Sequence, residues 1–195
     1  MSATTLEQTV RQRFRDHAVA AERLIESDAA AAVAEVAGAI VNAYREGHKL
    51  LLFGNGGSAA DAAHTAAELV GRYARERAAL PAIALGENVS SVTAISNDYA
   101  FERVFARQVE ALGTPGDVAI GISTSGASAN VVAGLEAARA EGLVTVGLTS
   151  GDGGAIVGAC DHCISIPPGE TPRVQESHIL VLHVLCELVE QELFP

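Results

Sequence analysis

One stretch, residues 50–68, restricts the possible folds of this chain more than any other, because a strand, a glycine turn and a helix follow one another directly. Residues 50–53 form a continuous apolar run, typical of a strand that is buried on both faces of a parallel sheet. Gly54-Asn55-Gly56-Gly57 comes next, where the backbone can turn with φ > 0. Such a unit predicts an open α/β sheet, which binds ligands beyond the carboxyl ends of its strands.

The helix after this turn carries polar residues at regular spacing. Ser58, with Asp61 three residues later, has the pattern of a helix N-cap answered by an acidic side chain. His64 and Glu68 are four residues apart, so they lie on one face of the helix, about one turn from each other. We therefore expect an imidazole and a carboxylate just beyond the end of a strand.

The remaining pattern predicts a single domain over residues 1–195. At 49% hydrophobic and 19% charged residues, the chain has the composition of a folded protein, and its length buries roughly 70% of the unfolded surface. Short apolar runs alternate with helical patterns after residue 47, which indicates a parallel sheet with right-handed crossovers. The five expected strands are 50–53, 81–85, 117–123, 144–149 and 163–167. Between and after them we expect a short helix or turn at 91–95 and helices at 100–112, 129–141, 155–159 and 173–193.

Two amphipathic helices, 5–27 and 29–46, precede the first strand. They cannot belong to a βαβ unit, because no strand comes before them. Residues 1–47 are therefore expected to form a helical extension that covers the sheet, packs on a partner subunit, or does both.

Charge and hydropathy exclude several classes of function. A formal net charge of -11 argues against non-specific nucleic-acid binding, which needs clustered Lys and Arg. No apolar run reaches the roughly 18 to 20 residues that span a bilayer, and the N-terminus lacks the apolar core of a signal peptide, so a cytoplasmic protein without membrane contact is expected. Cys160-Asp161-His162-Cys163 matches C-x-x-C, but a second pair is missing. Small, partly buried residues at a loop-to-strand junction are favoured over a redox or zinc site.

A second polar turn ends the third expected strand, at Ser123-Thr124-Ser125-Gly126-Ala127-Ser128. Hydroxyls, a glycine and free backbone N–H groups at a helix start can cradle a phosphate. The loop has no P-loop lysine, and the chain has no G-x-G-x-x-G, so neither nucleotide hydrolysis nor dinucleotide binding is favoured. Taken alone, the loop could simply cap a helix. Together with the first turn it predicts one crevice in which both turns meet.

These segments resemble the SIS (sugar isomerase) fold and, within it, the phosphoheptose isomerases, which act on sedoheptulose 7-phosphate. The matching motifs are GNGGSAADAAH (54–64), AEL (67–69), ISND (95–98), ISTSGASAN (122–130) and RVQESHILVLH (173–183). Ala127 stands where the family commonly has Asn, and Pro172 where some relatives have an acidic residue. The resemblance implies a flavodoxin-like five-stranded parallel sheet flanked by helices, a homotetramer with active sites shared between subunits, and an aldose–ketose isomerase that supplies heptose for lipopolysaccharide or other glycans.

The resemblance also implies roles for individual residues. The expected phosphate-binding residues are Ser123, Thr124, Ser125 and Ser128. The expected sugar-binding residues are Asn55, Gly56, Gly57, Ser58, Asn97 and Asp98, with Glu68, Gln175 and His183 also facing the substrate. The expected ligands of one Zn²⁺ per subunit are His64, Glu68, Gln175 and His183.

The residue types suit the implied chemistry. Ketose-to-aldose conversion through an enediol needs a base, an acid and a group that polarises the carbonyl oxygen. Glu68 and His183 are the expected catalytic residues, and the sequence leaves open which of them takes the first proton. Gln175 and His183 lie roughly 12 Å apart along a straight helix. Both could reach one ion if it lies between them, if Gln175 precedes the helix, or if they come from different subunits.

Two alternatives remain at the level of sequence. Some SIS proteins are regulators that bind the bacterial replication initiator and lack the catalytic Glu and His, whereas Glu68 and His183 are both present here. The other alternative is an isomerase of a different sugar phosphate, such as a pentose or hexose phosphate, because these motifs do not reveal the depth of the pocket.

Overall fold

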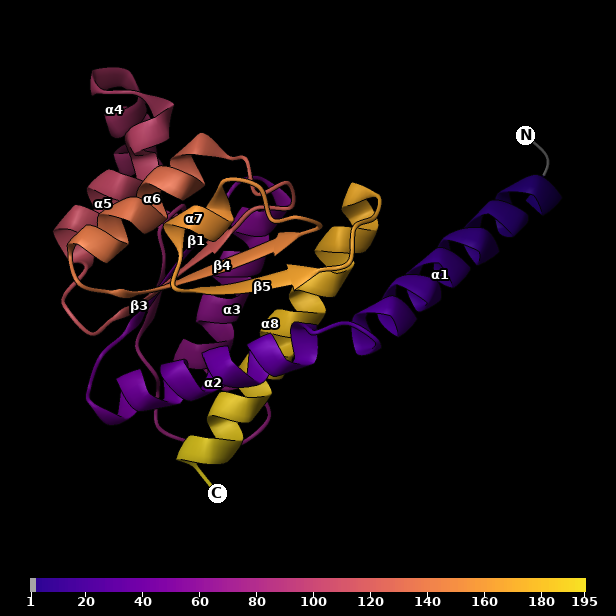
Figure 1. Ribbon diagram of the computed structural model, residues 1–195, viewed down its shortest axis with the longest axis horizontal. Coiled ribbons are helices and arrows are strands. Elements are labelled where there is room, and N and C mark those ends of the chain that lie inside the picture. The colour runs from indigo at the N-terminus through magenta and orange to yellow at the C-terminus, as the bar shows by residue number, and fades with distance from the viewer. Residues whose placement is uncertain (1–2) are drawn as a thin grey trace.

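In the computed structural model, which describes residues 3–195, five parallel strands form one sheet with helices on both faces (Figure 1). The strands are β1 (Leu50–Gly54), β2 (Ala82–Ala84), β3 (Val118–Ile122), β4 (Val144–Ser150) and β5 (His162–Ile166). Their order in the sheet is β2-β1-β3-β4-β5, and each neighbouring pair is parallel. The predicted flavodoxin-like architecture is confirmed.

Alternating side chains of the strands build two separate cores. In β1, Leu50 and Leu52 point to one face of the sheet, while Leu51 and Phe53 point to the other. The first face is covered by α2 (Ala29–Arg45), α3 (Gly57–Val70) and α8 (Thr171–Leu193). The second face is covered by α5 (Val104–Leu112), α6 (Ala129–Ala140) and the short α7 (Ile156–Ala159). Burial on both faces explains the continuous apolar runs of the sequence.

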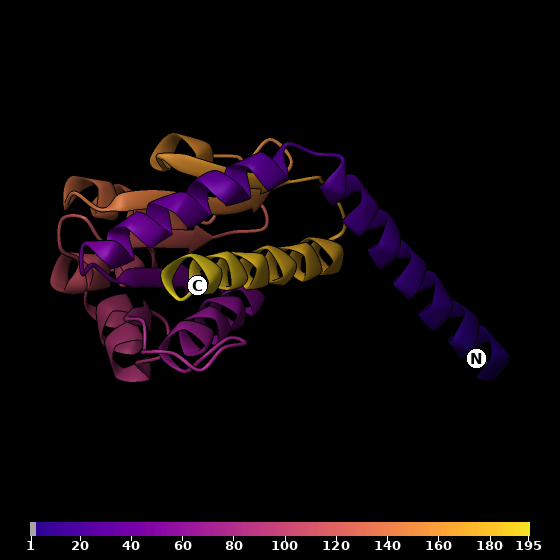
Figure 2. The ribbon, with the colours of Figure 1, turned by 90° about the horizontal axis from the view of Figure 1, so that it is seen from below.

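The first helix, α1 (Ala3–Ile25), leaves the body of the protein, as Figures 1 and 2 both show. It touches the start of α8, where Arg173 Nη1 donates to the carbonyl of Arg13 at 3.1 Å and His17 Nδ1 lies 2.7 Å from Glu176 Oε2. The second helix, α2, instead lies on the sheet beside α8. Of the two roles expected for the N-terminal extension, the structure shows the first: α2 covers the sheet. Helix α1 projects beyond the sheet, and its packing on a partner subunit stays a prediction.

The start of α3 differs from the prediction. The residue before the helix is Gly56, with φ +55°, and Ser58 lies buried inside the first turn without a capping hydrogen bond. The reason is the backbone: the turn needs a positive φ at this position, which glycine adopts at low cost and serine does not. Ser58 is therefore not the N-cap.

The segment after β2 is more helical than predicted. Helix α4 spans Val89–Asp98, whereas 91–95 was expected, because the Asn88 side chain accepts a hydrogen bond from Ser91 N at 3.1 Å and starts the helix earlier. The helix expected at 100–112 divides into a 3₁₀ turn, Phe101–Arg103, and α5.

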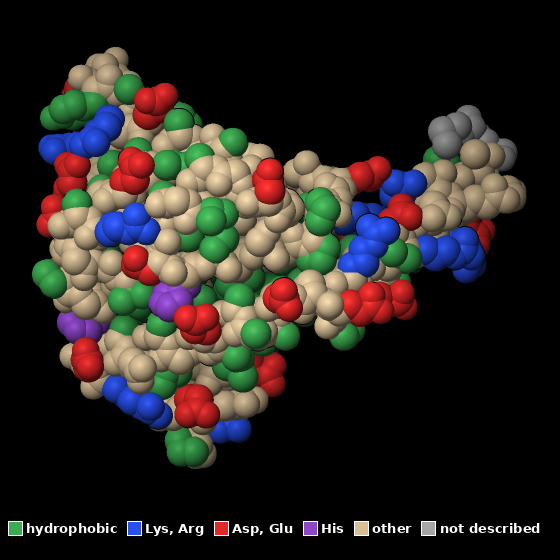
Figure 3. Space-filling view, viewed as in Figure 1, with side chains coloured by type: hydrophobic (Ala, Val, Ile, Leu, Met, Phe, Trp, Pro, Cys, Tyr) green, Lys and Arg blue, Asp and Glu red, His purple; other side chains and the backbone are tan. Residues whose placement is uncertain are grey.

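The charges are distributed unevenly over the surface. Figure 3 shows basic side chains gathered among acidic ones along α1, and scattered singly over the body of the protein in this view. No helix within residues 3–195 has both the length and the apolar character that crossing a membrane requires.

Candidate active site

The glycine turn after β1 brings the backbone unusually close to its neighbours. A Cβ on Gly54 would lie 2.7 Å from the Cβ of Ser58 and 2.9 Å from the carbonyl oxygen of Ile122. A Cβ on Gly57 would lie 2.4 Å from Gln175 Nε2. Glycine is therefore required at Gly54 by packing against β3, and Gly57 leaves room for the Gln175 amide at the start of α3.

A pair of amides joins this turn to the second polar turn. Asn55 Nδ2 donates to Asn130 Oδ1, and Asn130 Nδ2 donates to Asn55 Oδ1, both at 2.8 Å. Asn130 is buried at the start of α6, directly after the hydroxyl loop. The predicted meeting of the two turns is thus present. The sequence analysis missed Asn130, although it stands in the same motif as the loop.

The hydroxyl loop, residues 123–128, is fixed by contacts on its inner side. Ser123 Oγ and Ser128 Oγ lie 2.9 Å apart, and Ser150 Oγ donates to the carbonyl of Thr124 at 2.7 Å. Gly126 has φ +64°, and a Cβ there would lie 1.9 Å from the carbonyl oxygen of Gly153. Ser125 remains exposed and Thr124 partly exposed. Ser125 Oγ also accepts a hydrogen bond from Ala127 N at 3.3 Å, whereas the Thr124 hydroxyl takes no part in these contacts. The loop therefore keeps its shape with hydroxyls on its outer side, which suits an anion-binding loop.

Two imidazoles meet where α3 packs on α8. His64 Nε2 lies 2.9 Å from His183 Nε2 and 3.4 Å from Glu68 Oε1. The ring of Tyr73 lies 5.8 Å from that of His183, measured between centroids. The structure therefore brings together His64, Glu68 and His183, the three residues that the sequence analysis placed at the centre of the chemistry.

Gln175 lies apart from this group within one chain. It sits inside α8, so the possibility that it precedes the helix is wrong. Its amide lies against Gly57, seven residues before His64, which corresponds to about 10 Å along α3.

Asn97 and Asp98 are at the C-terminal end of α4, where Asn97 Nδ2 donates to Asp98 Oδ1 at 2.9 Å. Figure 1 shows α4 at one side of the sheet, away from α8. The two residues that the sequence analysis assigned to sugar binding thus do not join the α8 residues of the same chain.

Asp61, which the sequence analysis treated only as a capping residue, faces the site. Its Oδ2 is buried and has no hydrogen-bond partner. Burial raises the pKa of Asp61, while the nearby His64 and His183 act in the opposite direction. The position of Asp61 could have been predicted from its spacing in the sequence. Asp61, His64 and Glu68 are at i, i+3 and i+7 on α3, so they share one face of the helix.

The donor types at this point fit a zinc ion, which favours imidazole nitrogen and carboxylate oxygen. His64 and His183 converge, Glu68 is beside His64, and the unpartnered oxygen of Asp61 is a further acceptor. Within residues 3–195, however, no three His, Cys, Asp or Glu side chains are grouped closely enough to hold a metal ion. The fit to a zinc ion thus depends on the His64–His183 pair and the carboxylates beside it, because Gln175 lies against Gly57 and away from this pair.

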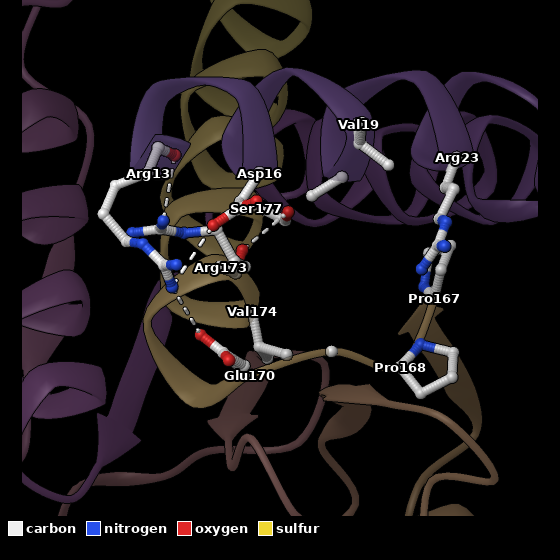
Figure 4. A pocket seen from close by; sticks show the side chains of 12 residues that line it. Arg13, Asp16, Val19, Arg23, Pro167, Pro168, Glu170, Arg173, Val174 and Ser177 are labelled. Carbon is white, nitrogen blue, oxygen red and sulfur yellow. Dashed lines mark hydrogen bonds and ion pairs between the residues drawn. The ribbon is translucent and has the colours of Figure 1, made fainter. Parts of the chain in front are cut away.

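A cavity of about 360 Å³ lies between α1 and the start of α8 (Figure 4). Arg13 pairs there with Asp16 at 3.2 Å and with Glu170 at 3.5 Å, and Arg173 pairs with Glu176. Carboxylates thus pair with Arg13 and Arg173, two of the three arginines that line the cavity, and none of the predicted site residues lines it. It is not the candidate active site.

The C-x-x-C segment lies where α7 leads into β5. Cys160 is buried and Cys163 partly buried, as the sequence analysis expected of a loop-to-strand junction. A hydrogen bond between the two thiols lowers the pKa of Cys160 to about 7 and raises that of Cys163.

Comparison with known proteins identifies the family of this chain. The model of the SIS domain matches residues 13–150. The phosphoheptose isomerase of Roseiflexus sp. is 59% identical over 88% of this chain and 87% of its own length. That of Trichlorobacter lovleyi is 52% identical over 95% of this chain and 94% of its own.

Solved structures give the same result. The phosphoheptose isomerase of Neisseria gonorrhoeae superposes with a TM-score of 0.89 at 38% identity, covering 95% of this chain and 99% of the other. That of Francisella tularensis gives a TM-score of 0.91 at 33% identity, covering 98% and 100%. The chain therefore belongs to the SIS-domain family and, within it, to the phosphoheptose isomerases.

Proposed function

We propose that this protein is an aldose–ketose isomerase that converts D-sedoheptulose 7-phosphate to D-glycero-D-manno-heptose 7-phosphate. One observation carries the proposal: the Asn55–Asn130 amide pair joins the hydroxyl loop to the turn that begins α3, and α3 presents Glu68 beside the His64–His183 pair. The hydroxyl loop is thus fixed relative to a carboxylate and an imidazole, which supports a role for the loop in holding the phosphate of the substrate. High identity to curated phosphoheptose isomerases supports the choice of a heptose phosphate.

The hydroxyl loop would hold the phosphate through the Thr124 and Ser125 hydroxyls and the backbone N–H groups that precede α6. Ser123 and Ser128, which lie side by side, would complete the loop. Because the phosphate is at the far end of the sugar from the carbonyl, binding it positions C1 and C2 without contact to the reacting atoms. This anchoring supplies the orientation on which the proton transfers depend.

Glu68 and His183 would carry the protons. One takes the proton from C1 of the ketose, and a proton returns to C2, while the carbonyl oxygen and the neighbouring hydroxyl exchange a proton through the enediol. A carboxylate oxygen of Glu68 is the simplest base, and His183 Nε2 is placed to give or accept a proton at oxygen. Contact with His64 Nε2 fixes the direction of the His183 ring.

His64, Glu68 and His183 of one subunit, with Gln175 supplied by another subunit, are the proposed holders of one Zn²⁺. When bound, the ion supplies Lewis-acid stabilisation of oxygen ligands and of the developing enediolate charge. Incubation with a chelator, followed by metal analysis and thermal melting, tests this part of the proposal. We expect a lower midpoint after metal removal and recovery with added Zn²⁺. A metal-free protein with an unchanged melting curve and full activity would contradict it.

The active form is proposed to be a homotetramer with sites at subunit interfaces. Two observations support a shared site: Asn97 and Asp98 lie away from α8, and Gln175 lies about two turns of α3 from the imidazole pair of its own chain. The projecting α1 supplies a helix surface for such contacts. We further propose that the enzyme works in the cytoplasm and makes heptose for lipopolysaccharide or another glycan.

Proton NMR in D₂O with sedoheptulose 7-phosphate tests the activity directly. Wild-type protein should convert the ketose to a heptose phosphate and incorporate deuterium at C2. Glu68→Gln and His183→Gln should lose about 100-fold or more in turnover while keeping sugar-phosphate binding, because general acid–base groups contribute roughly 10²- to 10⁴-fold. Binding without conversion by the wild type would instead favour a regulator, and conversion of only a pentose or hexose phosphate would reassign the substrate.

A further inference from the structure

A buried ion pair lies behind the candidate site. Arg77 Nε is 3.2 Å from Glu190 Oε2, and the two side chains are only 1% and 3% exposed. Arg77 belongs to the segment between α3 and β2, and Glu190 to the last turns of α8. Since Glu190 is seven residues after His183, both side chains lie on the same face of α8.

Arg77 holds the end of the helix that presents Glu68. Its guanidinium donates to the carbonyls of Glu68 at 2.8 Å and Leu69 at 2.7 Å. These carbonyls are in the last turn of α3, where no further helical N–H reaches them. The Arg77 side chain thus bonds two carbonyl groups at the end of α3, of which that of Leu69 also accepts from Leu80 N at 3.1 Å, and it fixes the position of the Glu68 backbone.

Glu190 holds the turn that follows. Its carboxylate accepts hydrogen bonds from the backbone N–H groups of Tyr73 at 3.3 Å, Ala74 at 3.1 Å and Arg75 at 2.7 Å. Burial alone would raise the pKa of Glu190, but these three N–H groups and Arg77 outweigh it and hold the pKa below its usual range. The turn so fixed places the Tyr73 ring 5.8 Å from the ring of His183.

We propose that Arg77 and Glu190 are positioning residues for proton transfer: Arg77 sets Glu68 through the end of α3, and Glu190 sets His183 through Tyr73. This inference rests on the proposed isomerase activity for its kinetic consequence only. A buried ion pair is a weak source of stability, because desolvation offsets the attraction between its charges. Its fixed geometry, directed at both proposed proton carriers, is the feature that a well-packed apolar pair would lack.

Kinetics of conservative variants test the proposal. Arg77→Lys keeps the charge but loses the fork that reaches both carbonyls, and Glu190→Gln keeps the shape but loses the ionic acceptor. In each folded variant we expect kcat to fall about 10- to 100-fold, as small displacements of reacting groups do, while KM stays within about threefold because the hydroxyl loop is untouched. A kcat within twofold of the wild type in both variants would overturn the proposal.

Asp117→Asn is the matched control. Asp117 is an equally buried carboxylate that accepts hydrogen bonds from Lys49 N at 3.0 Å and Thr114 N at 2.8 Å, but these partners belong to neither α3 nor α8. This variant should lower the thermal midpoint and keep kcat. If kcat fell as far in Asp117→Asn as in the Arg77 and Glu190 variants, a general loss of stability would be sufficient to explain the effect. That result would overturn the positioning role of Arg77 and Glu190.

Two further measurements keep the test decisive if the pair variants do not fold or the wild type lacks activity. Tyr73→Ala changes a partly exposed residue and should reproduce part of the kcat loss, whereas unchanged kcat would remove Tyr73 from the argument and overturn the proposed link to His183. NMR without substrate should show a cross-peak between the Tyr73 and His183 rings that is lost in Glu190→Gln and kept in Asp117→Asn. A cross-peak kept in both would overturn the proposal independently of turnover, so its failure is distinct from failure of the proposed function.

Discussion

At the scale of single residues, the Asn55–Asn130 pair connects the two loops of the candidate site. Each amide donates to and accepts from the other at 2.8 Å, and Asn130 is buried. The pair is the side-chain link between the glycine turn and the hydroxyl loop. If the two loops must keep a fixed separation to hold a sugar phosphate and its reacting end, this link is where that separation is set.

Asn130→Ala should therefore weaken both stability and function. The substitution leaves the Asn55 amide unpartnered, which we expect to reduce the free energy of unfolding by about 1–3 kcal/mol. Urea denaturation measures this change. The double variant Asn55→Ala/Asn130→Ala should lose less than the sum of the single changes, because the partners belong to one interaction. Strict additivity would contradict the coupling.

Asn97→Ala is the control for that experiment. The Asn97 amide donates to the adjacent Asp98 carboxylate, and both side chains are exposed. Its removal should change the free energy of unfolding by no more than about 0.5 kcal/mol. The same amide-to-methyl change thus separates an exposed amide from the one that joins the two loops.

At the scale of elements, glycines with positive φ determine where the loops turn. Gly126→Ala places a methyl group at φ +64° and about 1.9 Å from the Gly153 carbonyl oxygen, a backbone atom that cannot move alone. We expect a loss of several kcal/mol, or a displaced hydroxyl loop with weak sugar-phosphate affinity. Thermal melting and calorimetric titration with the substrate distinguish these results, and wild-type behaviour in both would contradict the assigned close contact.

Gly38→Ala is the matched substitution, and we expect it to raise the free energy of unfolding where Gly126→Ala lowers it. Gly38 is an exposed residue of α2, without positive φ, and no atom lies within 4 Å of an added Cβ. Alanine is favoured over glycine in a helix interior, so this variant should gain about 0.5–1 kcal/mol of stability.

The elements were predictable from the sequence where burial sets the pattern. All five strands and the long α8 follow from apolar runs and helical spacing, because a parallel sheet covered on both faces leaves few polar positions. The predicted start of α3 was wrong. The serine pattern indicates a cap at Ser58, but the close packing of Gly54 and the positive φ of Gly56 place the cap two residues earlier, at Gly56.

The sequence predicted the residues of the candidate site itself, but not the residues that hold them in position. His64 and Glu68 follow from helical spacing, and the family motifs supply His183 and the hydroxyl loop. The roles of Asn130, Tyr73, Arg77 and Glu190 could not be found in this way. The contacts of Asn130 with Asn55, and of Tyr73 and Arg77 with Glu190, join residues that are 75 to 117 positions apart in the chain. Contacts of that range depend on which helices pack together, and local patterns do not encode them.

At the scale of the whole molecule, buried carboxylates should make stability depend on acid pH. Burial alone would raise the pKa of Asp117, yet its bonds from Lys49 and Thr114 outweigh this and hold the pKa below its usual value, and Glu190 behaves in the same way. A carboxyl whose pKa is lower in the folded state stabilises the fold above its unfolded value of about 4. This stabilisation is lost as the pH falls from there through the folded pKa.

The free energy of unfolding should therefore fall between pH 5 and pH 2, with little change between pH 6 and pH 8 from these two groups. Asp117→Asn should be less stable than the wild type at pH 7 and show a shallower decline in acid, because Asn does not titrate. Urea denaturation at a series of pH values gives both slopes. Parallel curves for the two proteins would show that Asp117 has no part in the acid response.

The shape of the molecule also predicts how it assembles. Helix α1 projects from the body and exposes apolar side chains at helical spacing, with Leu6, Val10 and Phe14 about half or more exposed. An apolar stripe of this kind costs free energy in water unless another surface covers it. In the proposed tetramer, a second copy of this chain covers it, and Phe14, 71% exposed, would be buried between subunits.

Phe14→Glu should therefore convert the proposed tetramer to smaller species while leaving the fold of each subunit intact, because a charge at a buried apolar contact is strongly unfavourable. Light scattering after size exclusion measures the mass, and far-UV circular dichroism checks the fold. Leu112→Glu, at an exposed apolar position on α5, is the control and should leave the mass unchanged. If sites are shared, the Phe14 variant should also lose turnover in proportion to dissociation, and turnover should recover at high protein concentration. An unchanged mass for Phe14→Glu would exclude α1 from the subunit interface and separate the projecting helix from the activity.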